Sequence, residues 1–252
     1  RRLWLVSYPG SKMSPVQNRP ARRVKRFRMN SDLYADQNLD ASYVEFFFDP
    51  LCPWAYQASL WIREVRRLVA IRIEWRFFSL EETNLERGEK HPWERDWSYG
   101  WGPMRVGAYL RRQSMEDLDN WYAAIGRALH ENGEKMHNRS VAERIAEEAG
   151  FGREVVEAAI SDPSTNDEVR EDHEYAVREL GAFGVPTLDL GKGRVIFGPV
   201  VAPAPKGEEA VRLFRLILEW AEFPYLYELK RPKTSRDLER IASVFQPYLR
   251  AK

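Results

Sequence analysis

The sequence predicts a mixed α/β fold in which a helical block interrupts one sheet. Two observations carry this prediction. Strand-like and helix-like patterns follow one another as strand, helix, strand at 43–78, and as strand, strand, helix at 185–221. Between these regions, residues 91–181 show helical patterns only. The expected order is therefore βαβ, a large α-helical insertion between the second and third strands, then ββα.

The first half begins with YVEFFF at 43–48, a β-branched and aromatic run that predicts a buried strand. The segment IRIEWRFF at 71–78 alternates apolar and polar residues and predicts a second strand. The helix between them is expected to start at Pro53, since the first helical position needs no N–H. A strand–helix–strand unit of these lengths makes a parallel pair. The apolar stripe of this helix comprises Ala58, Trp61, Ile62, Val65, Leu68 and Val69.

The insertion is expected to hold several helices, the first around Trp101–Leu110. The Ser/Thr-x-x-Glu pattern of a capping box occurs at 140–143 and at 165–168, and predicts two helix starts. Gly150 is placed to end the first of these helices. A further apolar stripe comprises Leu118, Tyr122, Ile125 and Leu129.

The second half begins with VPTLDL at 185–190 and RVIFG at 194–198, joined by Gly-Lys-Gly. This pattern predicts a β-hairpin. A helix is expected directly after the hairpin, marked by Val211, Phe214, Leu218 and Ala221. The chain is expected to end in a second helix over Ser235–Leu249.

Charge divides the chain into a basic arm and an acidic body. The first 29 residues contain nine of the 39 basic residues and no acidic one, so the other 223 residues hold 30 basic against 38 acidic. We expect the arm to be disordered and the segment before Met29 to be dispensable. The run RPARRVKRFR at 19–28 could contact nucleic acid, but the body offers no second basic surface, so no nucleic-acid partner is expected. The predicted parts are 1–40, the arm; 41–90 and 182–234, the two halves of the fold; 91–181, the insertion; and 235–252, a C-terminal extension.

Composition excludes several classes of protein. The chain has one cysteine, Cys52, so an intrachain disulfide and a cysteine-only metal site are both excluded. We expect a cytoplasmic protein without a metal. No apolar run approaches the roughly 18–20 residues that span a bilayer, so no membrane association is expected. The oligomeric state stays open, with a homodimer among the alternatives.

Cys52 follows the first strand and precedes the helix that starts at Pro53. The free N–H groups and partial positive charge of a helix N-terminus lower the pKa of a thiol and favour its nucleophilic thiolate form. The alternative is a small buried apolar residue. A turn flanked by proline is a poor place to bury a thiol, so we favour a reactive Cys52.

The turn before the third strand holds Val185, Pro186 and Thr187, preceded by Gly184. In a βαβ–ββα chain with a cysteine at the first turn, this segment resembles the cis-proline loop of the thioredoxin fold. The resemblance implies that the Val185 backbone lies opposite Cys52 and docks an incoming thiol.

Several segments together resemble DsbA-like thioredoxin-fold oxidoreductases with a helical insertion, in particular the mycothiol-dependent nitroreductase branch. The resemblance covers about 43–234 in order. It implies a thioredoxin fold, a small-molecule substrate, and mycothiol or glutathione as cosubstrate. The matching segments are FFFDPLCPWAY at 46–56, WGPMRV at 101–106, WYAAIGRALHENG at 121–133, DHEYA at 172–176, GVPTL at 184–188, FGPVV at 197–201, PKGEEAVRLF at 205–214 and ELKRPKT at 228–234.

One position departs from the family pattern. The motif is usually Cys-Pro-Trp-Cys, and here the second cysteine position is Ala55. Without a resolving cysteine, thiol–disulfide exchange stops at a mixed disulfide until an external thiol attacks. The expected activity is therefore that of a monothiol oxidoreductase or thiol transferase acting through Cys52. Two alternatives remain: a thiol-dependent cis–trans isomerase of the same fold, and a redox-inactive binding descendant.

The resemblance adds candidate binding residues to Pro53, Val185, Pro186 and Thr187, each with a structural alternative. Trp54 could shield the thiolate or pack on the helix. His130 could line the site or face solvent, and Asn84 could contact the cosubstrate. His173, on an apolar face, is expected to be a core histidine. The aromatic residues that could line a substrate cleft are Trp93, Trp97, Tyr99 and Trp101.

Overall fold

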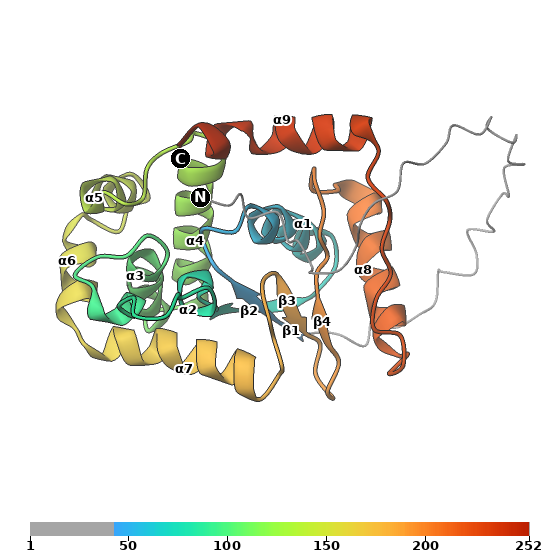
Figure 1. Ribbon diagram of the computed structural model, residues 1–252, viewed down its shortest axis with the longest axis horizontal. Coiled ribbons are helices and arrows are strands. Elements are labelled where there is room, and N and C mark those ends of the chain that lie inside the picture. Colours follow the sequence, from blue (N-terminus) through green and yellow to red (C-terminus); the bar gives the residue numbers. More distant parts are fainter. Residues whose placement is uncertain (1–42, 252) are drawn as a thin grey trace, which may run out of the picture. The chain divides into compact units, whose positions relative to one another are not determined.

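The computed structural model describes residues 43–251, and the predicted basic arm at 1–40 lies outside them. The described residues belong to one compact unit, shown in Figure 1. No helix within 43–251 combines the length and apolar character needed to cross a membrane.

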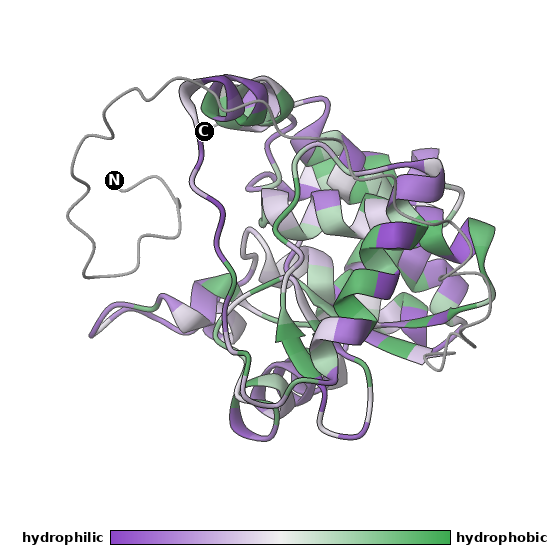
Figure 2. Cartoon of the chain, turned by 90° about the vertical axis from the view of Figure 1, so that its right-hand side faces the viewer, coloured by the Kyte–Doolittle hydropathy of each residue, from purple (hydrophilic) through white to green (hydrophobic). Residues whose placement is uncertain are grey.

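A four-stranded sheet in the order β2-β1-β3-β4 lies at the centre. β1 (Tyr43–Phe48) and β2 (Arg72–Phe77) are parallel. β3 (Thr187–Asp189) is antiparallel to β1 and to β4 (Val195–Phe197). The βαβ unit and the β-hairpin are both confirmed, and with them the thioredoxin fold. A strand arrow near the middle of Figure 2 is green, the colour of hydrophobic residues.

Alternate strand residues point to the same face of the sheet. On one face, these alternate residues of β1 and β2 are all apolar. Two helices pack there, α1 (Pro53–Leu68) and α4 (Met115–His130). The rings of Phe48 and Tyr122 stack at a centroid distance of 3.8 Å. α8 (Gly207–Ala221) packs on α1, where the Trp61 indole donates to the Ala210 carbonyl at 2.9 Å. The residues of this sheet face are Val44, Phe46, Phe48, Ile73, Trp75 and Phe77, all 3% exposed or less.

The other face is covered by α7 (Ser164–Arg178) through polar contacts. The buried Asp172 accepts from the Phe77 amide at 3.1 Å and from Arg76 at 3.0 Å. His173 is 6% exposed, and its Nδ1 accepts from the Ser79 amide at 3.1 Å. The expectation that His173 is a core histidine is confirmed.

Helices α3 to α7 lie between β2 and β3 in the chain, preceded by the short α2 (Leu80–Thr83) and a 3-10 turn, η2 (Pro92–Glu94). They are α3 (Trp101–Arg111), α5 (Arg139–Glu148) and α6 (Glu154–Ser161), together with α4 and α7.

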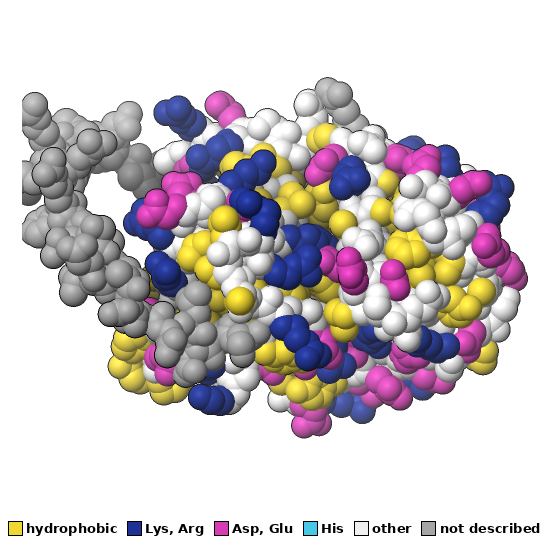
Figure 3. Space-filling view, turned by 180° about the vertical axis from the view of Figure 1, so that it is seen from behind, with side chains coloured by type: hydrophobic (Ala, Val, Ile, Leu, Met, Phe, Trp, Pro, Cys, Tyr) yellow, Lys and Arg dark blue, Asp and Glu magenta, His cyan; other side chains and the backbone are white. Residues whose placement is uncertain are grey.

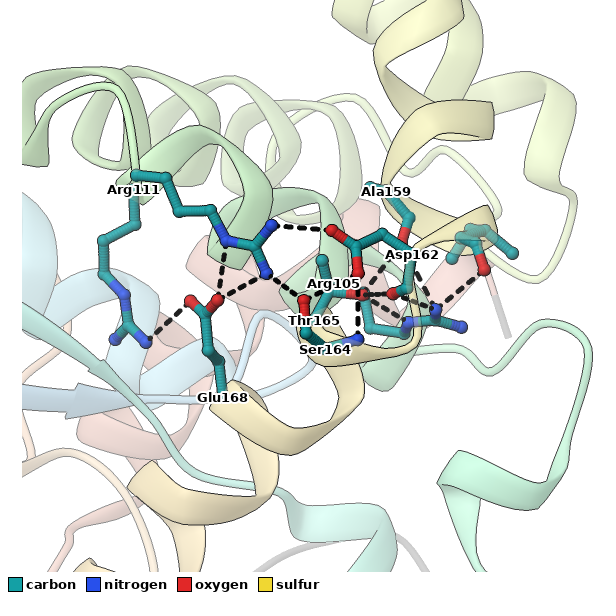
Figure 4. A network of polar contacts seen from close by, with 9 residues as sticks. Arg105, Arg111, Ala159, Asp162, Ser164, Thr165 and Glu168 are labelled. Carbon is teal, nitrogen blue, oxygen red and sulfur yellow. Dashed lines mark hydrogen bonds and ion pairs between the residues drawn. The ribbon is translucent and has the colours of Figure 1, made fainter.

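Arginines of α3 and its C-terminal end hold the α6–α7 turn (Figure 4). Arg105 is 6% exposed; its guanidinium donates to the Thr165 hydroxyl at 2.9 Å and to the Ile160 carbonyl at 2.8 Å. Burial lowers the pKa of Arg105. Arg112 joins Asp162 to Glu168. The buried arginine is therefore satisfied by carbonyls and a hydroxyl, as a buried charge must be.

Both predicted capping boxes are wrong. α5 begins at Arg139, because the Asn138 side chain accepts from the Ser140 amide and caps the helix. α7 begins at Ser164, and the Thr165 hydroxyl is turned inward toward Arg105. The α7 start at Pro163 has no side-chain cap, and at α5 the neighbouring Asn138 takes the place that the pattern gave to Ser140. The end of α5 is confirmed, with Gly150 at φ +85° directly after the C-cap.

The terminal helix α9 (Ser235–Ala251) is capped reciprocally by Thr234 and Asp237. It runs along the top of Figure 1, and its C-terminal part contacts α4. The predicted C-terminal helix is confirmed.

Charged side chains of both signs are spread over the face seen in Figure 3, with hydrophobic side chains between them.

Candidate active site

Cys52 is the N-cap residue of α1, directly after the turn that follows β1. Its amide donates to the Asp49 carbonyl at 3.0 Å, which closes the turn. Its Sγ accepts from the Ala55 amide at 3.4 Å, as an N-cap side chain does. Pro53 occupies the first helical turn. Ala55 is fully buried, so the position of a second cysteine is part of the core.

The loop before β3 meets Cys52 from the other half of the chain. The Val185–Pro186 peptide bond is cis. The Cys52 thiol donates to the Val185 carbonyl, with 3.4 Å between Sγ and O. Thr187 is 1% exposed, and its hydroxyl donates to the Gly184 carbonyl at 2.7 Å. The Thr187 side chain therefore shapes the loop from inside.

The expected low pKa of Cys52 is wrong for this arrangement. The residue is only 7% exposed, and burial raises the pKa of its thiol to about 12. The amides of Ala55 and Trp54 act in the opposite direction, and the Asp49 carboxylate adds to the rise. Loss of hydration disfavours the thiolate more strongly than the helix N-terminus stabilises it.

Asp49 is a buried carboxyl beside Cys52 that sequence reasoning missed. Its two oxygens accept from the Leu51 amide at 2.8 Å and the Leu80 amide at 2.7 Å. Burial raises its pKa to about 7 despite these bonds, and the charge of Glu81 adds to the rise. The only sequence signal was the Asp-Pro dipeptide after the first strand, which indicated a turn.

His130, at the end of α4, lies under the same turn. It is 4% exposed, and because a carbonyl can only accept, its Nε2 donates to the Pro50 carbonyl at 2.8 Å. Its ring packs between Tyr56 and Tyr248, at centroid distances of 4.9 and 5.0 Å. Burial lowers the pKa of His130 to about 4, so the ring is neutral at pH 7. The solvent-facing alternative is thus excluded.

α9 contributes two aromatic side chains to the region around Cys52. Phe245 meets the Trp54 ring edge-on, with a centroid distance of 4.7 Å and an angle of 88°. Tyr248 packs on His130, and its phenol lies near enough to Cys52 and Asp49 for their charges to raise its pKa, after the larger effect of burial. The sequence showed that a terminal helix exists, but no signal placed it here.

Asn84 does not take part in this cluster of contacts. It is exposed at the C-cap of α2, and its side-chain amide donates to the Leu80 carbonyl at 2.7 Å.

The four insertion aromatics form separate contacts. The rings of Trp93 and Trp101 are 5.3 Å apart. Trp97 donates to the Met136 carbonyl, and Tyr99 stacks on His137. Within 43–251, no three His, Cys, Asp or Glu side chains gather as a metal site would require.

Solved structures share this fold at low sequence identity. A 2-hydroxychromene-2-carboxylate isomerase superposes with a TM-score of 0.53 at 19% identity, covering 71% of this chain and 95% of its own. The cytosolic disulfide reductase DsbM from Pseudomonas aeruginosa, solved with GSH, gives 0.51 at 17% identity, covering 70% and 99%. The probable DsbA oxidoreductase SCO1869 from Streptomyces coelicolor gives 0.52 at 18% identity, covering 76% and 94%. These similarities establish a DsbA-like thioredoxin fold.

Sequence comparison gives the family. The uncharacterized protein Rv2286c from Mycobacterium tuberculosis is 53% identical over 206 residues, which is 82% of this chain and 89% of that protein. The model of the Rv2466c-like family, described as mycothiol-dependent nitroreductase Rv2466c, matches residues 51–231. That range contains Cys52, the helical insertion and the Val185–Pro186 loop. The chain belongs to the Rv2466c-like family.

Proposed function

We propose that this protein is a thiol-dependent oxidoreductase that works by a monothiol mechanism through Cys52. The observation that supports it is the position of Sγ, which lies 3.4 Å from both the Ala55 amide and the Val185 carbonyl. A peptide or thiol bound along the Val185 backbone would bring its own sulfur next to the Cys52 sulfur. Ala55 leaves Cys52 without a partner in its own chain, so the second thiol must come from solution.

The proposed exchange balances in two steps. The substrate is a mixed disulfide that joins a substrate sulfur to the low-molecular-weight thiol. The Cys52 thiolate attacks the cosubstrate sulfur, forms a mixed disulfide with it and releases the substrate sulfur as a thiolate. A second molecule of the thiol then attacks the mixed disulfide, regenerates Cys52 and releases the disulfide of the cosubstrate.

Reduction of a small electrophile uses the same residues. Cys52 and one cosubstrate thiol deliver two electrons and two protons as they join in the mixed disulfide. A second cosubstrate thiol then completes the cycle, as in the exchange reaction. The electrophile is therefore reduced by two cosubstrate thiols, which leave as one disulfide.

The residues around Cys52 are proposed to stabilise its thiolate or to bind the cosubstrate. The amides of Ala55 and Trp54 stabilise the thiolate once it forms, because both lower its pKa. The loop at Val185 and Pro186 is the proposed dock for the cosubstrate, with Thr187 holding its shape. Pro53 orients the first turn of α1. Asn84, exposed on α2, is the weakest of the proposed contacts.

The family description supports mycothiol as the cosubstrate, with glutathione as the substitute in another host. A single free cysteine acts in this cycle only where the thiol pool is reduced, so we place the protein in the cytoplasm.

The test is the intact mass of the protein after incubation with mycothiol disulfide or glutathione disulfide at pH 7 and pH 9. We expect one adduct on the wild-type protein, forming faster at pH 9 because the thiolate fraction is larger. Cys52→Ser should give none. Absence of an adduct at both pH values would reject the monothiol mechanism and favour a redox-inactive binding protein.

A thiol-dependent cis–trans isomerase is the second candidate, favoured by Ala55. Such a reaction uses a bound thiol without net oxidation, so it needs no resolving cysteine. Turnover with no disulfide of the cosubstrate formed would identify it, whereas stoichiometric disulfide formation would exclude it.

A further inference from the structure

The C-terminal part of α9 packs beside the Cys52 site through few buried side chains. Between residues 235 and 249 only Phe245 and Tyr248 are buried, each 8% exposed. The Phe245 ring packs on the ring of Trp54, two residues from the cysteine, and the Tyr248 ring packs on His130. The Pro247 carbonyl lies against Gly133, where an added Cβ would be 2.7 Å from the oxygen. The first two turns of α9 are almost entirely exposed.

The segment that leads into α9 would let the helix leave without disturbing the sheet. Residues 227–234 are all exposed and belong to no helix or strand. Eight extended residues can span about 27 Å, and a helix is only about 10–12 Å wide. The segment is therefore long enough for α9 to move away by more than its own width. Upstream of this segment, the Trp220 indole ties down the Leu226 carbonyl at 3.0 Å. A hinge is therefore available between an anchored point and the cover.

The helix itself is weakened at the point of contact. Pro247 lies between the two buried aromatics and cannot donate to the Ser243 carbonyl. Besides these two aromatics, the described α9 side chains that pack against the core are Ile241 and Val244, and both are partly buried. A helix with so few buried side chains and an internal proline belongs to the part of a protein that opens locally before the rest unfolds.

We propose that α9 is a movable cover of the Cys52 site, and that Phe245 and Tyr248 must leave it before a cosubstrate as large as a tripeptide thiol reaches Sγ. In the closed arrangement the thiol is buried and protonated, so it does not react. In the open arrangement water and cosubstrate reach Sγ, and the Ala55 and Trp54 amides then act on a hydrated sulfur. This inference extends the proposed function, but its test needs no turnover.

The experiment measures the alkylation rate of Cys52 in the full chain with iodoacetamide and with the bulkier fluorescein maleimide. In a Phe245→Ala/Tyr248→Ala variant we expect the rate with fluorescein maleimide to rise at least about tenfold, because the open fraction sets the reactivity of a covered group. The rise with iodoacetamide should be smaller. Leu238→Ala, a change at an exposed position of the same helix, is the matched control and should react like the wild type.

A second measurement guards against a variant that is simply misfolded. Hydrogen exchange of the wild-type protein should show α9 amides exchanging before those of α1. After glutathione disulfide has modified Cys52, α9 should lose protection while α1 keeps it. Equal alkylation rates in the wild type and the double variant, or α9 protection equal to that of α1, would overturn the proposal.

The two proposals fail separately. Faster alkylation of the double variant without any thiol adduct on the wild type would leave the cover standing and reject the monothiol enzyme. An adduct that forms at the same rate in both proteins would leave the enzyme standing and reject the cover.

Discussion

The Cys52 thiol donates a hydrogen bond to the carbonyl of Val185, a residue 133 positions further along the chain, across 3.4 Å. This contact joins the two halves of the thioredoxin fold at the proposed site. A thiol can donate to this carbonyl and a thiolate cannot, so the contact agrees with the raised pKa of the buried Cys52 thiol.

A second cysteine at the position of Ala55 should convert the site into a dithiol. The Ala55 amide already lies 3.4 Å from Sγ, one helical turn from Cys52. Under oxidising conditions we expect Ala55→Cys to lose both free thiols, with the intact mass falling by two hydrogens. Overpacking the buried position should lower the free energy of unfolding by about 1–3 kcal/mol.

Ala58→Cys is the matched control for the dithiol. Ala58 is equally buried, but it lies a further turn along α1, so its sulfur should stay a thiol. An Ala55→Cys variant that keeps two titratable thiols after oxidation would contradict the site geometry.

Asp49 should make the stability of the protein fall as pH rises from 4 to 7. Its pKa is raised from 3.8 to about 7 by burial, so the folded state binds more protons than the unfolded state in this window. The stability that Asp49 contributes is therefore greatest below pH 4, and the loss of this contribution by pH 7 is at most about 4 kcal/mol. Urea unfolding should show that the free energy of unfolding of the wild type, relative to that of Asp49→Asn, falls across this range. If this difference grew with pH, the pKa of Asp49 in the folded protein would be low and the prediction wrong.

The stability that His130 contributes should rise with pH between about pH 4 and 6.5, opposite to the contribution of Asp49. Burial lowers its pKa from 6.5 to about 4, so the unfolded state binds more protons between these values. Stability supplied by the neutral ring is complete above pH 6.5 and is lost toward pH 4, by about 3 kcal/mol at most. In His130→Gln, which keeps a donor for the Pro50 carbonyl, this dependence should vanish. The measurement is the difference in unfolding free energy between the two proteins, and a difference independent of pH would refute a buried neutral His130.

Gly126→Ala should destabilise the protein although alanine favours helices. An added Cβ would meet the Tyr56 ring at 2.5 Å, and this ring packs on His130. We expect a loss of about 1–3 kcal/mol from overpacking, which exceeds the roughly 1 kcal/mol gained in helix propensity. The exposed Asn120→Ala in the same helix should be neutral or slightly stabilising. Thermal unfolding distinguishes the two, and equal melting temperatures would show that Tyr56 can move aside.

Periodic elements were predictable, but capping and burial were not. The alternation in β2 is visible in the sequence because each strand residue faces the opposite way from its neighbour, and β1 is visible as a β-branched and aromatic run. The start of α5 was not, because Asn138 and Ser140 are both competent caps and only the folded backbone selects Asn138. Asp49 escaped notice because one carboxylate in a turn carries no pattern.

The sequence alone determined the fold class, the family and the position of Cys52 at a strand-to-helix turn, because periodicity, proline placement and ordered motifs are local properties. Only the tertiary structure decided the state of that cysteine. Its raised pKa, the neutral His130 beside it, and the closure by Phe245 and Tyr248 all follow from burial. Burial depends on which segments meet in space, and α9 reaches Cys52 from almost 200 residues away.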